Sequence, residues 1–119
     1  MPRFGELEAA IMEAVWAAGG PVAVRDVADP LKRDRGSAFN TVQTVMEILF
    51  RKGWLEREKR GRAYRYWAAA SREDYTAALM GEALETAADR AAALVRFAAD
   101  MTPDEAAELR RALDQAREG

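Results

Sequence analysis

The chain has 119 residues, of which 50% are apolar and 32% are charged, and its net charge is −2. This is the ordinary composition of one soluble domain, or of two very small ones. The chain has no cysteine and no histidine, which excludes disulfides and removes the commonest general base and transition-metal ligand, so we expect no enzyme, no metal and no cofactor.

Neither a membrane span nor a secretory signal is predicted. No apolar run approaches the ~20 residues that cross a bilayer. Arg3, Glu6 and Glu8 lie where the apolar part of a signal peptide would be needed. We therefore expect a cytoplasmic protein that does not insert into a membrane.

Charge is distributed unevenly along the chain. Residues 1–70 carry a net charge of +3 and residues 71–119 a net charge of −5, and residues 51–65 hold seven basic and only two acidic side chains. Because phosphate responds to the local patch, the acidic overall balance is compatible with nucleic-acid binding.

Two helices are predicted first. Apolar residues recur at helical spacing over residues 4–18, and the turn residues at 19–21 end that helix. Residues 24–31 predict a short second helix. Pro30 should bend this helix or end it early, and residues 32–36 should form a polar connection.

The third predicted helix covers residues 38–52 and has two faces. Its core face is predicted to consist of Val42, Val45, Met46 and Leu49, at i, i+3, i+4 and i+7. Its opposite face carries Asn40, Thr44, Glu47 and Arg51, flanked by Thr41, Gln43 and Ile48. Glu47 could accept from a cytosine amine, but pairing with Arg51 is the favoured interpretation. Gly53 should end the helix in a left-handed cap.

A basic hairpin follows directly. Trp54–Lys59 and Arg62–Trp67 are rich in aromatic and alternating residues, as short strands are, and Arg60 and Gly61 should form the turn. Three helices followed by a hairpin are the order of a winged helix. The predicted fold is therefore mainly α with a small β-hairpin, formed by a winged helix-turn-helix domain and a C-terminal three-helix domain.

Composition changes at residues 68–72, and three more helices are predicted beyond this join. The first covers about 72–87, where Ser71 and Asp74 resemble a capping box. The second covers about 89–100. The third begins after Thr102, with a proline at its first position and acidic residues in its first turn.

Dimerisation is predicted from the size of this second half. About fifty residues of short helices rarely bury enough apolar surface to be stable alone. We therefore expect a DNA-binding domain over residues 1–69 and a domain over residues 70–119 that pairs with a second copy. The residues predicted at this interface are Tyr75, Leu79, Leu84, Leu94, Phe97, Leu109 and Leu113.

The third helix and the hairpin together indicate DNA binding. Asn and Gln can bind adenine through two hydrogen bonds, and Thr can pack its methyl group on thymine. The alternative is that this face only meets solvent. Solvent-exposed helix faces elsewhere in the chain, however, consist of Glu, Arg, Asp and Ala, so a face of Asn, Thr and Gln is unusual here. Phosphate contacts need positive charge but no fixed geometry. The predicted DNA-binding residues are Asn40, Thr41, Gln43, Thr44, Arg51, Lys52, Arg60 and Arg62, and Arg57, Lys59 and Arg65 extend the same cationic set.

Two other functions stay open on the residues alone. The winged helix could be a rigid scaffold for protein interaction, which would show no salt-sensitive DNA affinity. The chain could also be a ligand-responsive regulator with a pocket in its C-terminal half, although that half looks too small and alanine-rich to enclose one.

Several segments resemble the penicillinase-repressor family of the BlaI/MecI type, and the resemblance covers nearly the whole chain. The matching segments are Gly5–Trp16 for the first helix, Thr41–Val45 with Leu49–Gly53 for the recognition helix, Gly61–Tyr66 for the wing, and Ser71–Tyr75, Arg90–Leu94 with Phe97, and Ala107–Leu113 for the C-terminal half.

The resemblance implies a homodimeric transcriptional repressor with one winged helix on each half of a palindromic double-stranded operator. Family members typically control β-lactamase or related resistance genes. They are inactivated when a membrane sensor-protease triggers cleavage in the C-terminal domain. The matching bond here is Arg96–Phe97, and a cut there would remove the last helix and weaken the dimer.

This chain departs from the family pattern at four points. Many relatives carry arginine at the position of Ile48, and relatives usually have a hydroxyl cap near Ala23. Pro30 is also unusual in the second helix. The copper-responsive branch of the family uses C-terminal cysteines, which this chain lacks, so metal sensing is not expected.

Overall fold

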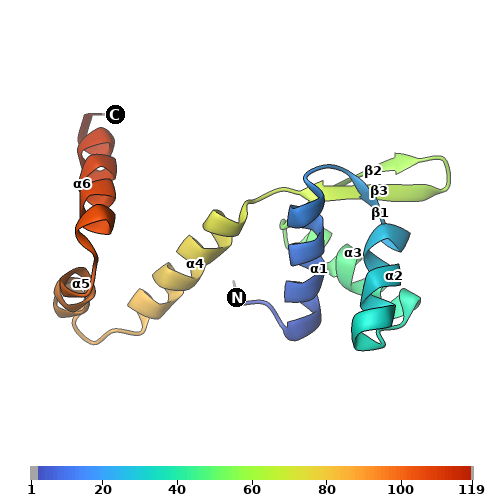
Figure 1. The fold of residues 1–119 in the computed structure, drawn as a ribbon, viewed down its shortest axis with the longest axis horizontal. Coiled ribbons are helices and arrows are strands. Elements are labelled where there is room, and N and C mark those ends of the chain that lie inside the picture. The colour runs from blue at the N-terminus through green and yellow to red at the C-terminus, as the bar shows by residue number, and fades with distance from the viewer. Residues whose placement is uncertain (1–2, 119) are drawn as a thin grey trace. The chain divides into compact units, whose positions relative to one another are not determined.

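The computed structural model describes residues 3–118, which form six helices and three strands (Figure 1). The chain divides into two compact units, one ending at Leu79 and one beginning at Met80. The N-terminal unit contains α1 (Glu6–Ala18), β1 (Val22–Ala23), α2 (Val24–Arg35), α3 (Phe39–Arg51), β2 (Leu55–Arg60), β3 (Ala63–Ala68) and the first part of α4 (Arg72–Glu85).

The sheet is antiparallel, with strand order β1-β3-β2. Arg60 pairs with Ala63, so the turn is Gly61-Arg62 and each strand lies one residue later than predicted. Gly61 has a φ of +64°, the left-handed conformation that glycine adopts at the first position of a type II′ hairpin turn. Strand β1 was not predicted, because two residues cannot display an alternating pattern.

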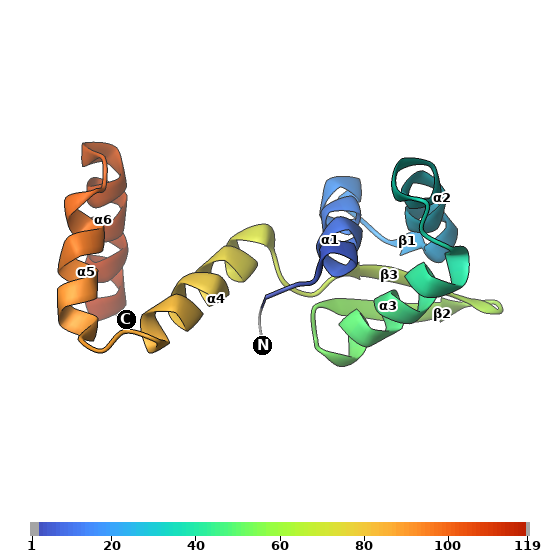
Figure 2. The same ribbon diagram turned by 90° about the horizontal axis from the view of Figure 1, so that it is seen from below.

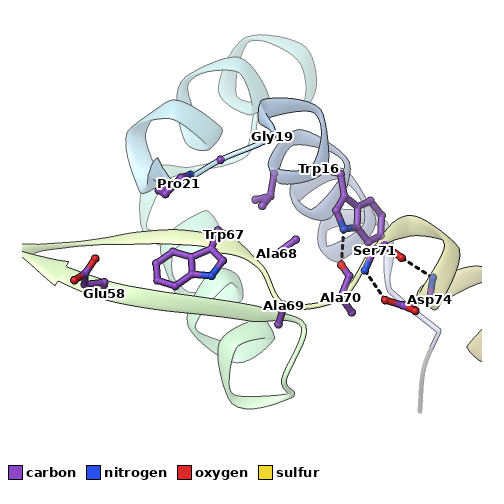
Figure 3. Close-up of a pocket in the computed structure, with 12 residues that line it drawn as sticks. Trp16, Gly19, Pro21, Glu58, Trp67, Ala68, Ala69, Ala70, Ser71 and Asp74 are labelled. Atoms are coloured by element: carbon purple, nitrogen blue, oxygen red, sulfur yellow. Dashed lines mark hydrogen bonds between the residues drawn. The ribbon is translucent and has the colours of Figure 1, made fainter.

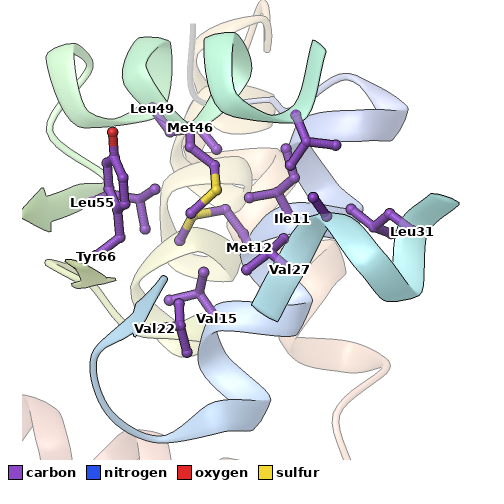
Figure 4. Close-up of a cluster of buried hydrophobic side chains, with 12 residues drawn as sticks. Ile11, Met12, Val15, Val22, Val27, Leu31, Met46, Leu49, Leu55 and Tyr66 are labelled. Atoms are coloured by element: carbon purple, nitrogen blue, oxygen red, sulfur yellow. The ribbon is translucent and has the colours of Figure 1, made fainter. Parts of the chain in front are cut away.

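One apolar core fills the N-terminal unit (Figure 4). Its fully buried centre joins α1 to α3, where Met12 and Met46 lie together. The core face of α3 is confirmed for Val42, Met46 and Leu49, which are all 0% exposed. The other buried members of the core are Ile11, Val15, Val22, Val27, Ala28, Leu31, Leu55 and Tyr66.

Helix α2 corrects one prediction. It continues through Pro30 to Arg35, so the expected early end is wrong, and the predicted polar connection is the last turn of the helix. A proline inside a helix removes one backbone hydrogen bond, but burial of the adjoining turns, with Val27 at 1% and Leu31 at 8% exposure, offsets that loss. Gly36 then ends the helix in a left-handed cap.

The ends of the neighbouring helices follow standard capping chemistry. Gly53 is left-handed at the end of α3, and the Trp54 N–H donates to the Leu49 carbonyl at 3.0 Å, as in a Schellman motif. This confirms the predicted cap. At the start of α2, Ala23 offers no hydroxyl, but its N–H donates to Oδ2 of Asp26 at 2.9 Å.

The C-terminal unit contains the rest of α4, together with α5 (Arg90–Ala99) and α6 (Pro103–Glu118). Reciprocal caps fix two helix starts, of which the Ser71–Asp74 capping box was predicted, whereas only the N-cap at Thr102 was predicted for the other. Ser71 and Asp74 exchange bonds of 2.8 and 3.0 Å, and Thr102 and Glu105 exchange bonds of 2.8 and 3.1 Å. None of the described helices is both long and apolar enough to cross a membrane.

Candidate nucleic-acid interface

The polar face of α3 is open to solvent. Asn40, Thr41, Gln43 and Thr44 are all exposed, opposite the buried stripe of the same helix. The predicted pair on this face is confirmed, because Arg51 donates to Glu47 at 2.8 Å. This pair stabilises the helix and holds the Arg51 guanidinium at the edge of the amide and hydroxyl surface.

A groove joins this helix to the hairpin. Figure 2 shows α3 running alongside β2 and β3. The groove has a volume of about 550 Å³, and its walls include Gln43 from α3 and Arg62 from the hairpin turn. The structure therefore brings together one predicted base-reading side chain and one predicted phosphate-binding side chain.

The predicted DNA-binding cations differ in how far an acidic partner within the chain neutralises their charge. Lys52 donates to Glu8 at 2.9 Å and ties the end of α3 to α1. Arg60 lies 3.8 Å from Glu58 on its own strand. Arg62 takes part in none of the ion pairs formed within residues 3–118, so its charge is the least neutralised of these three.

The Glu8 carboxyl responds to the Lys52 contact. Burial by itself raises the pKa of Glu8, but the Gly5 N–H and the Lys52 ammonium both stabilise the charged form, and the net effect lowers the pKa below its ordinary value of 4.5. Lys52 therefore has a structural role in the chain beside any contact with phosphate.

Arg57 occupies a different environment from the other hairpin cations. Its Cζ atom lies 4.1 Å from the ring centre of Phe50 and 4.0 Å from that of Tyr64. Its Nη1 donates to the Tyr66 hydroxyl at 3.3 Å. This hydrogen bond is the main reason why the pKa of Arg57 lies above its ordinary value.

Two aromatic residues at the groove were not among the predicted site residues. Phe39, the first residue of α3, is 44% exposed and lines the groove, as does Tyr64, which is 36% exposed. Spacing alone would place Phe39 at the edge of the apolar stripe, because it precedes Val42 by three residues and Met46 by seven, so its exposure could not be predicted from the sequence. Tyr66 is only 2% exposed, so it belongs to the core.

A second pocket lies on the part of the N-terminal unit formed by the end of α1, the turn after it and the end of β3 (Figure 3). Its volume is about 580 Å³, and its walls include the indoles of Trp16 and Trp67. Both indoles already donate within the chain, Trp16 to the Ala70 carbonyl at 2.8 Å and Trp67 to Glu56 at 2.9 Å. The polar edge of each indole is thus already satisfied within the chain.

Tyr75 packs inside the N-terminal unit. Its ring stacks on Phe4 at 4.1 Å and meets Trp54 edge-on at 5.5 Å, and its hydroxyl accepts from the Phe4 N–H at 2.8 Å. Arg72 adds two bonds of 2.9 Å to the Glu13 carboxylate. The first turns of α4 thus belong to the compact N-terminal unit, beyond the predicted boundary at Ala69.

The other predicted interface residues leave apolar surface uncovered. Leu79 and Leu84 are partly buried. Leu94, Phe97, Leu109 and Leu113 are between 43% and 56% exposed. Arg96 is exposed beside Phe97 within α5. Helices α4, α5 and α6 contribute no buried residue to the described part of the chain.

Comparison with known sequences gives matches over the whole chain. The penicillinase repressor family matches residues 4–115. The transcriptional regulator BlaI of Mycobacterium tuberculosis, in the CDC 1551 and H37Rv strains, is 38% identical over 122 aligned positions, which cover 100% of this chain and 88% of the relative.

Comparison with solved structures gives matches for the winged helix. The DNA-binding domain of the repressor BlaI aligns with a TM-score of 0.55 and 26% identity, covering 62% of this chain and 89% of that one. The monomeric form of Bacillus licheniformis BlaI, solved in complex with the blaP half-operator, aligns with a TM-score of 0.53 at the same identity and coverage.

Proposed function

This chain belongs to the penicillinase repressor family, and from that premise we propose that it acts as a homodimer on a palindromic operator. It is a transcriptional repressor of the BlaI type with a winged-helix DNA-binding domain. In the proposal, α3 enters the major groove of each half-site and the hairpin holds the adjoining backbone.

One observation supports this docking above the others. Gln43 of α3 and Arg62 of the hairpin turn line the same groove. A duplex seated on α3 therefore offers a base edge to the amide and a phosphate to the guanidinium at the same time. Asn40, Thr41 and Thr44 extend the reading face along the helix, and Arg51, Lys52 and Arg60 supply further positive charge.

The proposed dimer is formed by the C-terminal helices. Four large apolar side chains are about half exposed there, on α5 and α6, and a second copy of the same surface would remove them from water. Leu79 and Leu84 on α4 would continue that interface. Tyr75 is occupied by Phe4 and Trp54, so its proposed part is to fix α4 to the winged helix.

Linking two winged helices makes the second half-site contact intramolecular. Such linkage raises apparent affinity by roughly 10² to 10⁴ without any new contact. Any event that separates the two copies therefore releases the operator and leaves the reading face unchanged.

Cleavage between Arg96 and Phe97 is the proposed release step, carried out under the control of a membrane sensor-protease system. The bond lies inside α5, and Phe97 is 52% exposed. A cut there would detach Phe97 and all of α6 from the rest of the chain, and with them three of the five exposed large apolar side chains on α5 and α6. The remaining fragment would keep the winged helix but lose most of the dimer surface.

Selection of duplexes from a random-sequence library tests the proposal. The full chain should recover an inverted repeat, because each copy reads one half. A fragment ending at Arg96 should recover only single half-sites and should sediment as a monomer. Recovery of unrelated sequences by the full chain, with no salt-dependent affinity, would point instead to a protein-interaction scaffold.

A further inference from the structure

Arg57 is the one cation of the hairpin whose guanidinium is held between two rings. Phe50 comes from α3 and Tyr64 from β3, and Arg57 itself lies on β2. The planar guanidinium stacks on aromatic faces as a flat group, and it stays charged throughout the physiological pH range. The three side chains therefore form a clamp between the recognition helix and both strands of the hairpin.

The clamp lies where the hairpin leaves the sheet. Arg57 pairs across the ladder with Tyr66, and Tyr66 pairs with Val22 of β1. Beyond the next residue pair, Ala23 with Arg65, the ribbon continues toward its turn with only two strands. A two-stranded ribbon is only marginally stable by itself, so its direction depends on contacts at its base.

We infer that Arg57 is a positioning residue for DNA binding, which sets the angle between the hairpin and α3 by clamping between Phe50 and Tyr64. This inference rests on the proposed function, because the angle has a consequence only if both elements contact one duplex. Arg62 at the tip and Gln43 on α3 line one groove, and the clamp would limit how far the hairpin can swing away from α3 and carry Arg62 out of reach of the same duplex. Arg57 thus differs from Arg62, whose proposed part in DNA binding depends on its charge.

Arg57→Lys separates geometry from charge. Lysine keeps the positive charge but lacks the flat group that stacks on two rings. We expect the variant to bind a duplex recovered by library selection about tenfold more weakly, with the salt dependence of the affinity unchanged. The matched control is Lys59→Ala on the same strand, which should lower the slope of log affinity against log salt by about one.

A double-mutant cycle tests whether Arg57 acts through its contact with Phe50. Phe50→Leu removes one wall of the clamp, so its effect on DNA affinity should overlap with that of Arg57→Lys, and the double variant should bind little worse than either single variant. Additive losses would overturn the inference, and so would wild-type affinity in Arg57→Lys. Absence of salt-dependent DNA affinity in the wild-type chain would instead refute the proposed function.

A measurement on the unaltered chain covers the case in which a variant is poorly folded. Rings on both faces of the guanidinium should move the Arg57 Nε–H signal upfield in a proton–nitrogen spectrum. The inference predicts that this signal keeps its position when the selected duplex is added. A large downfield change on addition would mean that Arg57 leaves the rings to bind phosphate, which would overturn the inference.

Discussion

Three of the four arginines of the hairpin carry the same charge in clearly different surroundings. Arg57 is stacked between two rings, Arg60 lies 3.8 Å from Glu58, and Arg62 lies in the turn at the edge of the groove. A phosphate gains most from a cation that is not already neutralised. Among these three residues, Arg62 is therefore the one best placed to contribute to DNA affinity.

Substitution of Arg62 and of Gln43 should have different effects on DNA binding. Arg62→Ala should weaken binding to all sequences alike and lower the salt slope by about one. Gln43→Ala should leave the slope unchanged and relax discrimination at one base pair by about 1–3 kcal/mol. Titrations of selected and mismatched duplexes over a salt series measure both effects. An unchanged slope for Arg62→Ala would remove Arg62 from the interface.

Glu8 gives a prediction for acid stability. Its pKa is lowered in the folded chain from 4.5, so its stabilising contribution is complete above that value and is lost as the pH falls through the folded-state pKa. Glu8→Gln keeps an acceptor for the Gly5 N–H but loses the ion pair with Lys52. It should lower the free energy of unfolding at neutral pH by about 1 kcal/mol or less and make the acid-side decline shallower.

Melting curves measured between neutral and acidic pH test this expectation. Glu6→Gln is the matched control, because the Glu6 side chain is 94% exposed and lies 3.8 Å from Arg35. That variant should follow the wild-type pH profile. Equal acid-side declines in the wild type and Glu8→Gln would contradict the assignment.

Residue type and spacing on α3 predicted its exposed polar face, its buried stripe and the Glu47–Arg51 pair. The fate of individual cations could not be predicted in this way. Lys52 meets Glu8, which lies 44 positions away in the chain, and Arg57 on strand β2 meets the ring of Phe50 on helix α3. Such partners come together only through tertiary packing, so a pattern of basic residues does not separate phosphate ligands from structural cations.

At the scale of elements, predictions held where the signal was local. Gly53, the Ser71–Asp74 pair and the N-cap Thr102 are caps built from neighbouring residues, and the structure has all three. Strand β1 and the continuation of α2 through Pro30 depend on distant partners. The local preference of Pro30 was overridden by burial of its own helix on the core.

Helix α4 provides a prediction about the boundary of the winged-helix domain. Tyr75 completes an aromatic cluster with Phe4, Trp16 and Trp54, and each aromatic pair contributes about 0.5–1.5 kcal/mol beyond its buried area. A fragment ending at Leu79 should therefore unfold at a higher temperature than one ending at Ala69, by at least several degrees.

The matched control is Tyr75→Ala in the longer fragment, which should remove most of that gain. Thermal unfolding of the three fragments, followed by circular dichroism, gives the comparison. Equal melting temperatures for the two lengths would place the domain boundary at Ala69, where the sequence predicts it.

At the scale of the whole molecule, the two units differ in how far they bury their apolar side chains. The N-terminal unit encloses a core, whereas the described helices of the C-terminal unit bury no residue and leave Leu94, Phe97, Leu109 and Leu113 about half exposed. The shortage of core was predictable from length alone, since fifty residues seldom suffice. Which helices would meet in the proposed dimer was not predictable, because that depends on the second copy.

The most direct test is the ratio of affinities for a full palindromic operator and for a duplex carrying one half-site. For the wild-type chain, the two linked winged helices of the proposed dimer should give a ratio of about 100 or more. Leu113→Asp would place a charge in the proposed interface, and for this variant the ratio should fall to about the statistical factor of two while half-site affinity is retained. A wild-type ratio near two would contradict the account, since it would mean that the winged helices bind DNA independently of each other.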